Sequence, residues 1–273
     1  MLFRRARGRR RLGRARRPRL ARRIALVAAL ATVCGGLVSA WFLFPQSDEP
    51  SGPPKAAIVD QLSLTAPNPD FVEKATGQLE QAGYVVDYYP GEQVDVDFYR
   101  RLPVYDYKVV VFRVHADRLK AMWRGEEIDD VILFSSEPYD RQRYVHEQAQ
   151  NKLVIARYSE GGPGYFGIAP DFFDELGDFD DTTVIMMGCE GLVSERAAQA
   201  FIDKGAKTYI SWDETVSATH TDAATERLLQ YWLIEGLTTG EAVAKTMAEL
   251  GPDPYYGSAL RLYPADAAAL ALP

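Results

Sequence analysis

Two continuous apolar runs constrain the fold of this chain more than any other feature. Residues 108–114 (KVVVFRV) and 183–187 (TVIMM) are almost entirely apolar and show no alternation of polar and apolar side chains. Such runs are typical of strands that are covered on both faces, as in parallel sheets with helices on either side. Stretches with helical periodicity lie between the apolar runs. The sequence therefore predicts an α/β fold with a largely parallel sheet.

Further elements are expected on both sides of these two runs. Additional strands are expected at residues 56–59, 85–89, 131–134, 208–212 and 258–263, with 152–156 and 164–168 forming a hairpin. Helices are expected at residues 69–83, 194–204, 217–235 and 239–250. Their ends are indicated by Asn68 before Pro69, by Gly205, and by Thr238 with Glu241 in capping-box spacing.

A membrane-spanning segment is expected near the N-terminus. Residues 24–44 contain no charged side chain, and a helix of that length reaches about 31 Å, the thickness of a bilayer core. The preceding residues 1–23 contain twelve arginines and no acid, which places this end in the cytoplasm by the positive-inside tendency. We therefore expect a single-pass membrane protein whose C-terminal domain is extracytoplasmic.

A cleaved signal peptide is the alternative, because Val38-Ser39-Ala40 offers small residues suited to a signal peptidase. The apolar run continues through Phe44, which favours an uncleaved signal anchor, and either alternative exports the same domain. The expected organisation is an Arg-rich cytoplasmic tail at 1–23, a transmembrane helix at 24–44, a Pro-rich linker at 45–55, a folded domain at 56–265 and a C-terminal tail at 266–273.

The part of the chain after residue 23 is strongly acidic. It holds all 38 acids but only 19 of the 31 lysines and arginines, which gives about −19. This charge argues against a nucleic-acid partner. The two cysteines, Cys34 and Cys189, lie in different surroundings, which excludes a small disulfide-stapled fold. The sequence contains no Gly-rich phosphate loop, so no nucleotide cofactor is expected.

Two reactive side chains stand where the two buried strands end. His115 follows the run at 108–114, and Gly188-Cys189 follows the run at 183–187. The carboxyl ends of parallel strands are where active sites collect in open sheets. A helix N-terminus and a protonated imidazole would both lower the pKa of the Cys189 thiol. The N–H groups of Cys189 and of the residue after His115 could form an oxyanion hole. We therefore expect a Cys/His dyad.

The two strand-end motifs resemble those of the caspase-like cysteine peptidases, which include legumain, clostripain, gingipain, separase and the CHAT domains. The resemblance rests on Val110–His115 and Val184–Cys189, on Glu190-Gly191 after the cysteine, and on the helix, Gly-Ala turn and strand at 200–212. It covers roughly residues 56–263. It implies a caspase-like α/β/α sandwich that cleaves peptide bonds of a protein substrate, with Cys189 as nucleophile and His115 as catalytic histidine.

The same resemblance implies further site residues. Asp60 and Asp213 match positions that line the pocket for the substrate residue before the scissile bond (P1), and two carboxylates there would favour Arg or Lys. The alternative is that neither aspartate binds substrate: Asp60 would cap a turn, and Asp213 would cap the helix expected near residue 217. Trp212 would form a wall of the cleft or pack in the core. Ala116 stands where the family usually has glycine, and its Cβ narrows the backbone shapes available to the oxyanion hole.

Two other functions are alternatives to a caspase-like peptidase. His220-Thr221-Asp222 has the His-x-acid spacing of class I glutamine amidotransferases, which would give a triad of Cys189, His220 and Asp222. Met187, in place of the glycine expected two positions before the nucleophile, argues against that triad. The other alternative is a catalytically inactive binding or scaffolding domain that keeps the fold.

No metal is expected in the site. An acidic stretch could bind calcium, but its spacing matches no EF-hand loop and a solvated acidic face is the favoured interpretation. This stretch consists of Asp171, Asp174, Glu175, Asp178, Asp180 and Asp181.

Overall fold

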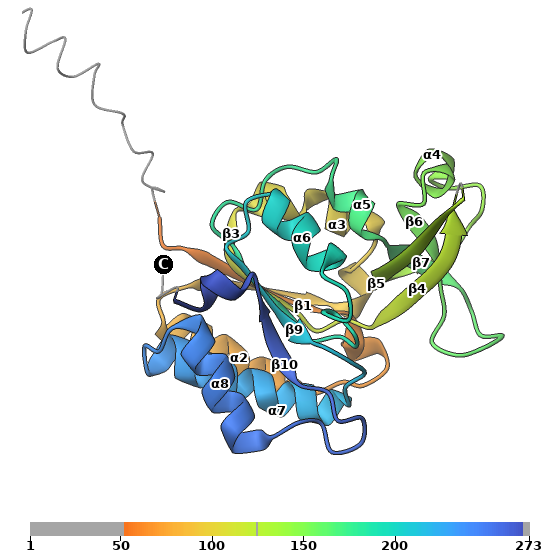
Figure 1. The fold of residues 1–273 in the computed structure, drawn as a ribbon. Coiled ribbons are helices and arrows are strands. Elements are labelled where there is room, and N and C mark those ends of the chain that lie inside the picture. The colour runs from red at the N-terminus through yellow and green to blue at the C-terminus, as the bar shows by residue number, and fades with distance from the viewer. Residues whose placement is uncertain (1–51, 124, 270–273) are drawn as a thin grey trace, which may run out of the picture. The chain divides into compact units, whose positions relative to one another are not determined.

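The computed structural model describes residues 52–123 and 125–269 (Figure 1). The expected Arg-rich tail, the membrane segment at 24–44 and most of the linker at 45–55 lie outside these ranges. Within the described ranges, none of the helices has the length and apolar character that crossing a bilayer requires. The described ranges include the domain expected at 56–265, except residue 124.

A six-stranded sheet forms the centre of this domain, in the order β10-β9-β8-β3-β1-β2. Its strands are β1 (Lys55–Asp60), β2 (Val85–Pro90), β3 (Tyr107–Phe112), β8 (Thr183–Met186), β9 (Thr208–Trp212) and β10 (Leu260–Tyr263). All neighbouring pairs are parallel except β10 and β9, which are antiparallel. The largely parallel sheet predicted from the sequence is confirmed.

Helices cover both faces of this sheet (Figure 1). One face carries α2 (Pro69–Gln81), α7 (Ala218–Leu229), its π-helical continuation η4 (Gln230–Ile234) and α8 (Thr239–Leu250). The other carries α3 (Val96–Arg101), α5 (Pro170–Phe173) and α6 (Arg196–Asp203). Successive residues of β1 serve the two cores in turn, with Ala56 and Ile58 on the first side and Ala57 and Val59 on the second. Such double burial explains why the strand is apolar at consecutive positions.

The helix ends follow the capping signals in the sequence. The Asn68 side chain accepts a hydrogen bond from the N–H of Phe71, with Pro69 as first helical residue of α2. Thr238 and Glu241 form the expected capping box at the start of α8. The short 3-10 helices that connect the main elements are η1 (Gln61–Leu64), η2 (Gly91–Gln93), η3 (Leu102–Tyr105) and η5 (Ala265–Ala269).

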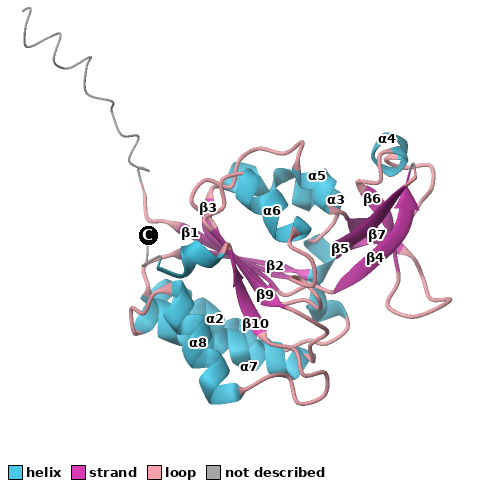
Figure 2. Ribbon diagram, viewed as in Figure 1, coloured by secondary structure: helices cyan, strands magenta, loops and turns pink. Residues whose placement is uncertain are grey.

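A second, antiparallel sheet stands beside the first (Figure 2). Its order is β4-β5-β7-β6, and its strands are β4 (Ala116–Trp123), β5 (Glu126–Pro138), β6 (Leu153–Ala156) and β7 (Tyr165–Ile168), with the short helix α4 (Val145–Ala149) leading to β6. The expected hairpin of β6 and β7 is confirmed. The strand expected at 131–134 belongs to β5, in this second sheet, and the sequence analysis did not identify β4.

A buried arginine joins three elements near the carboxyl end of β3. Arg113 directly follows this strand, and its guanidinium contacts Asp60 at 2.7 Å and Asp222 at 2.7 and 2.9 Å. It also donates to the carbonyl of Ala66 at 2.7 Å. The exposed fractions are 1% for Arg113, 1% for Asp60 and 4% for Asp222. The cluster therefore ties the end of β1, the end of β3 and the helix α7 together in the interior.

The remaining acceptor sites of this cluster are also used. Tyr88 donates its hydroxyl to Asp60 at 3.1 Å, and the Asn68 side-chain amide donates to Asp222 at 2.8 Å. A buried ion pair is tolerated when its hydrogen-bonding groups are satisfied, whereas removal of one partner leaves an uncompensated charge. We refer to Arg113, Asp60 and Asp222 as the Arg113 cluster.

Replacement of this arginine is expected to destabilise the fold strongly. Arg113→Met leaves two buried carboxylates without a cation, and we expect the free energy of unfolding to fall by about 3–5 kcal/mol. The control is Lys74→Met, because Lys74 forms an exposed ion pair with Glu226 and its loss costs at most about 1 kcal/mol. Urea unfolding measures both. Equal, small losses in the two variants would contradict the importance of the Arg113 cluster.

Candidate active site

His115 and Cys189 leave the central sheet from neighbouring strands at the same level. Strands β3 and β8 are parallel and adjacent, with Phe112 paired to Met186 as the last pair in register. The N–H of Met187 then donates to the carbonyl of Phe112 at 2.9 Å. His115 lies three residues beyond Phe112 and Cys189 three residues beyond Met186. The two reactive residues thus emerge at one edge of the sheet, as the sequence predicted.

The turns that carry the two residues touch each other. A Cβ on Gly188 would lie 2.6 Å from the carbonyl oxygen of Val114 and 3.0 Å from the Cβ of Ala116. Both contacted residues are chain neighbours of His115. Any side chain with a Cβ would clash with the neighbouring backbone here. Gly188 therefore allows the turn that carries Cys189 to lie against the segment that carries His115.

The backbone around Cys189 is also tightly placed on its other side. A Cβ on Gly191 would lie 2.0 Å from the Oγ of Ser211 on β9. Glu190, between the cysteine and this glycine, has a φ of 60°, the left-handed conformation that non-glycine residues rarely adopt. Such conformations persist where the surrounding structure imposes them, and they cluster at functional sites.

Three neighbours fix the position of His115. Its Nε2 is hydrogen-bonded to the Oγ1 of Thr65 at 2.8 Å, and its ring packs on the ring of Tyr158 with centroids 4.8 Å apart. Its backbone N–H donates to the Oε1 of Gln61 at 3.0 Å. Gln61 is completely buried, and its Nε2 donates to the hydroxyl of Tyr158. The side chain of Gln61 therefore fixes both the backbone of His115 and the aromatic ring that supports its imidazole.

The imidazole is held in the neutral form. Burial lowers the pKa of His115 below its ordinary value, and the positive charge of Arg113 lowers it further. A neutral imidazole at neutral pH can accept a proton, which is what a general base requires.

The thiol of Cys189 is held in the protonated form, which corrects the expectation that its pKa is lowered. Burial raises the pKa of Cys189, and the charges of Glu190 and Asp117 raise it further. Sγ donates a hydrogen bond to the carbonyl of Val216 at 3.5 Å, which stabilises the protonated thiol. The expected helix dipole is missing at this position, because α6 begins only at Arg196 and residues 189–195 form turns.

Sγ and the imidazole each bind another partner. Among the hydrogen bonds of residues 52–123 and 125–269, none joins the ring of His115 to Sγ of Cys189, because Nε2 is bonded to Thr65 and Sγ donates to Val216. Proton transfer from the thiol therefore requires Sγ to leave the carbonyl of Val216. The imidazole can accept the proton on Nδ1, or on Nε2 if it leaves Thr65.

Ala116 presents its N–H to the space beside the cysteine turn. The N–H of Phe134 donates to the carbonyl of His115 at 2.9 Å, and Ala116 pairs with Leu133 in the antiparallel ladder. Since hydrogen-bonded and non-hydrogen-bonded pairs alternate, the N–H of Ala116 points away from β5. That direction suits the oxyanion-hole role expected for Ala116 together with the N–H of Cys189.

The carboxylates expected to bind a basic P1 residue already have cationic partners. Asp60 belongs to the Arg113 cluster and is almost completely buried. Asp213 pairs with Arg261 at 2.9 Å and accepts a hydrogen bond from the N–H of Ala259 at 2.7 Å. The geometry therefore does not support either aspartate as a free cation-binding group.

Trp212 has no exposed surface, so it packs in the core and does not form a wall of an open cleft. Its indole N–H donates to the Oγ1 of Thr221 at 2.9 Å. The alternative reading of Trp212 as a core residue is the one that the structure favours.

The amidotransferase-like triad is not assembled. Asp222 is bound by Arg113 and Asn68, while the Nε2 of His220 lies 3.2 Å from the carbonyl of Gly251. The two residues are i and i+2 on α7, a spacing at which helical side chains do not face each other.

Three of the six residues of the acidic stretch after β7 form ion pairs. Asp171 pairs with Arg196, Glu175 with Lys152, and Asp181 with Lys207. These pairs agree with the favoured interpretation of a surface acidic face.

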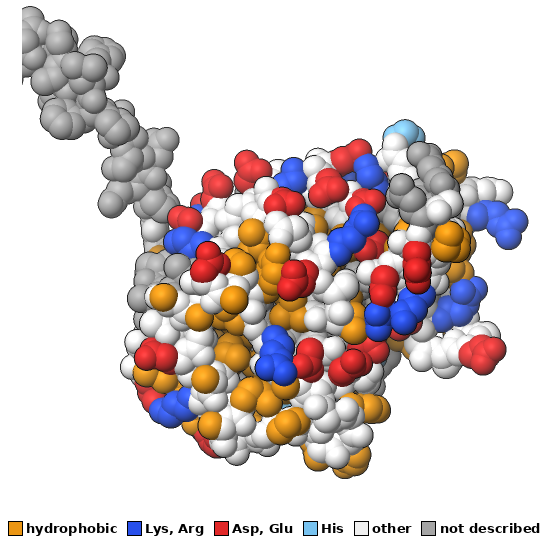
Figure 3. Space-filling model, in the orientation of Figure 1, with side chains coloured by type: hydrophobic (Ala, Val, Ile, Leu, Met, Phe, Trp, Pro, Cys, Tyr) orange, Lys and Arg blue, Asp and Glu red, His pale blue; other side chains and the backbone are white. Residues whose placement is uncertain are grey.

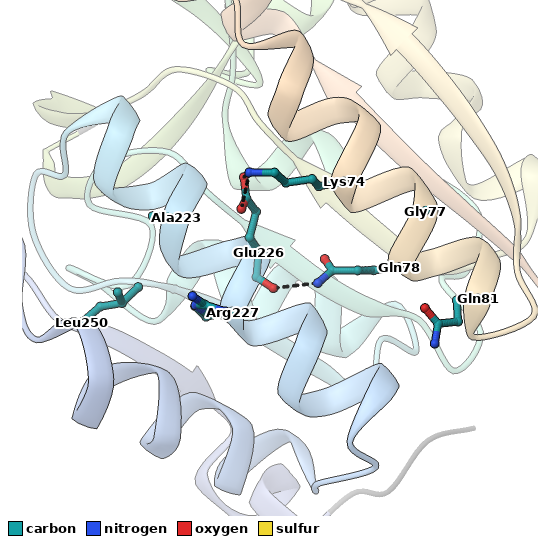
Figure 4. A pocket seen from close by; sticks show the side chains of 8 residues that line it. All are labelled: Lys74, Gly77, Gln78, Gln81, Ala223, Glu226, Arg227 and Leu250. Carbon is teal, nitrogen blue, oxygen red and sulfur yellow. Dashed lines mark hydrogen bonds and ion pairs between the residues drawn. The ribbon is translucent and has the colours of Figure 1, made fainter.

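Cavities away from the strand ends do not suggest a different site. A cavity of about 610 Å³ lies between α2 and α7, where Glu226 pairs with Lys74 at 3.1 Å and its carbonyl accepts a hydrogen bond from Gln78 (Figure 4). Lys74 and Gln78 both bond to Glu226, and side chains of these kinds are common on helix surfaces.

Sequence reasoning missed Gln61, Thr65 and Tyr158, because isolated polar and aromatic residues in connecting segments carry no pattern. Arg113 did carry a signal, since a charged residue within the otherwise apolar run at 108–114 must find a partner when it is buried. The identity of its partners is not readable from the sequence.

Comparison with known proteins adds no assignment: a scan against protein-family models found no match to this chain, and a search of curated proteins found none.

The protonated thiol gives a testable pH dependence. In the full chain with Cys34→Ser, we expect the rate of Cys189 alkylation by iodoacetamide to rise with pH through a midpoint above that of an ordinary thiol, about 8.5. Glu190→Gln removes a nearby negative charge and should lower this midpoint, whereas Glu175→Gln, on the acidic face, should not. A reactivity plateau that already begins near pH 6 would contradict the neutral resting pair.

Proposed function

We propose that this domain is a cysteine endopeptidase of the caspase-like type, with Cys189 as nucleophile and His115 as general acid and base. The observation that carries the proposal is the placement of both residues three positions beyond the last paired residues of adjacent parallel strands. The contact of Gly188 with both chain neighbours of His115 supports it. The α/β architecture with helices on both sheet faces is compatible with the proposed family.

The proposed reaction has two stages. When a peptide carbonyl enters the site, His115 accepts the thiol proton and Sγ bonds to the carbonyl carbon. The N–H groups of Ala116 and Cys189 stabilise the resulting oxyanion. His115 then donates the proton to the departing amine as the C–N bond breaks, which leaves an acyl-enzyme. Water, deprotonated by His115, hydrolyses this thioester and releases the acid and the thiol.

The neutral resting state fits this order of events. A buried thiol and a neutral imidazole require no charge separation before the substrate binds. Substrate binding must then replace the hydrogen bond from Sγ to Val216. The P1 preference for Arg or Lys is not carried by Asp60 or Asp213, because Arg113 and Arg261 hold them.

Membrane attachment is part of the proposal and rests on the sequence. Residues 24–44 would anchor the chain, with residues 1–23 in the cytoplasm and the peptidase domain outside it. No nucleic acid and no cofactor takes part in the proposed chemistry.

A binding domain without turnover is the second candidate function. The observation that favours it is the thiol, which is protonated and bonded to the Val216 carbonyl rather than to an imidazole. The activity experiment below separates the two functions.

The test uses acyloxymethyl ketone probes with Arg, Lys, Asp, Asn or Leu at P1 on the purified full chain with Cys34→Ser. We expect covalent labelling that Cys189→Ala abolishes and that His115→Ala reduces about a hundredfold or more. His220→Ala is the matched histidine control and should label almost normally.

Loss of labelling in His220→Ala alone would instead assign the amidotransferase-like triad. A folded wild type that no probe labels and that cleaves none of the corresponding peptides would contradict the peptidase and leave the binding domain.

A further inference from the structure

Strand β4 has one neighbour and one open edge. It begins at Ala116, immediately after His115, and it is the outer strand of the order β4-β5-β7-β6. Within the described ranges, no strand pairs with its other side. The row of backbone groups on that side is therefore a template for another extended chain.

The register shows which groups face the open edge. Because Phe134 donates to the carbonyl of His115, the N–H and C=O groups of Ala116, Arg118 and Lys120 point away from β5. The N–H of Arg118 is bonded to the carboxylate of its neighbour Asp117 at 2.8 Å, instead of to a strand. A side chain that an incoming peptide can displace thus occupies the open edge.

The open edge borders the nucleophile. Gly188 approaches Ala116 at the start of β4. Asp117 lies close enough to Cys189 for its negative charge to raise the pKa of the thiol. A peptide lying along β4 from Ala116 onwards would therefore have one end beside Sγ.

The charges beside this edge favour a basic peptide. Asp117, Asp129, Glu190 and Glu214 are acidic, whereas Arg118 and Lys120 are basic. Both oxygens of Asp129 bind Arg118 at 2.5 Å, and the four acids exceed the two bases. On the face seen in Figure 3, acidic and basic side chains lie together over the second sheet. The excess of acid next to the thiol would attract lysine or arginine side chains near the scissile bond.

We propose that the open edge of β4 is the docking site of the protein substrate, to which an extended basic segment adds as an extra strand next to the scissile bond. The inference rests on the proposed peptidase function, whose site it shares. Main-chain hydrogen bonds would supply affinity that depends little on sequence, and the acidic residues would select the charge of the segment.

Binding without turnover tests this docking site separately from catalysis. Fluorescence anisotropy would follow a short labelled peptide of alternating Lys and Val, with a Glu-Val peptide as charge control, on the full chain with Cys34→Ser and Cys189→Ala. We expect the Lys-Val peptide to bind and the Glu-Val peptide to bind much more weakly.

Three variants isolate the edge. Arg118→Pro removes an outward N–H and leaves the bonds to β5, since proline is tolerated at such edge positions; we expect about tenfold weaker binding. Arg118→Ala keeps the N–H and removes a positive charge, so binding should stay equal or tighten. Val86→Pro makes the same backbone change on β2, an outer strand of the central sheet, and should leave binding unchanged. Circular dichroism checks that each variant is folded.

Equal binding by Arg118→Pro and the parent chain, or no binding of the Lys-Val peptide, would overturn the docking site. A chain that sediments as a dimer, and as a monomer only after Arg118→Pro, would also overturn it, because the edge would then pair with a second copy. In each of these cases, probe labelling at Cys189 still decides the peptidase function on its own.

Discussion

The charge of one buried arginine fixes the geometry on which the candidate site depends. Arg113 lies two residues before His115 and is held by Asp60 at the end of β1 and by Asp222 on α7. Unpaired charges in a protein interior are costly, so alternative arrangements of these three segments are strongly disfavoured. The end of β3, and the imidazole that follows it, are thereby fixed relative to the helix layer that packs against Cys189.

The same arginine also influences the chemistry. Its positive charge adds to the effect of burial in keeping His115 neutral, while buried surroundings and neighbouring carboxylates keep Cys189 protonated. The two groups therefore start as a neutral acid and a neutral base, each bonded to the protein itself. Activation then begins with the loss of the hydrogen bond from Sγ to Val216, after which the thiol proton passes to the imidazole.

Much of the fold was predictable because a strand that is buried on both faces has apolar residues at successive positions. The runs at 108–114 and 183–187 are apolar at successive positions since both sheet faces are covered, and this pattern located both strand ends and hence His115 and Cys189. Strand β4 was not predicted because its residues 116–123 mix Asp, Arg and Lys with apolar residues. It lies at a sheet edge, where neither face imposes a clear alternation of polar and apolar side chains. The neighbouring strand at 131–134 was found, although not its sheet.

The roles of charged residues were less predictable because their partners are distant in sequence. Asp60 and Asp213 looked like pocket carboxylates until their pairing with Arg113 and Arg261, 53 and 48 residues away, was known. The spacing of His220 and Asp222 suggested a pair, but a helix turns residues i and i+2 in different directions. A structural role can be assigned to three other residues only from their contacts around His115; they are Gln61, Thr65 and Tyr158.

The central claim is that His115 and Cys189 share one site, and the pKa of His115 after chemical modification of Cys189 tests it most directly. In the Cys34→Ser chain, iodoacetate places a carboxylate on Sγ, and iodoacetamide places a neutral group of similar size there. NMR titration of labelled histidines should show a pKa of His115 about one unit higher with the carboxylate than with the amide. The chemical shifts of His146, on α4, should be the same in the two forms and serve as the control. A shift at His220 instead, or no shift at His115, would contradict the shared site.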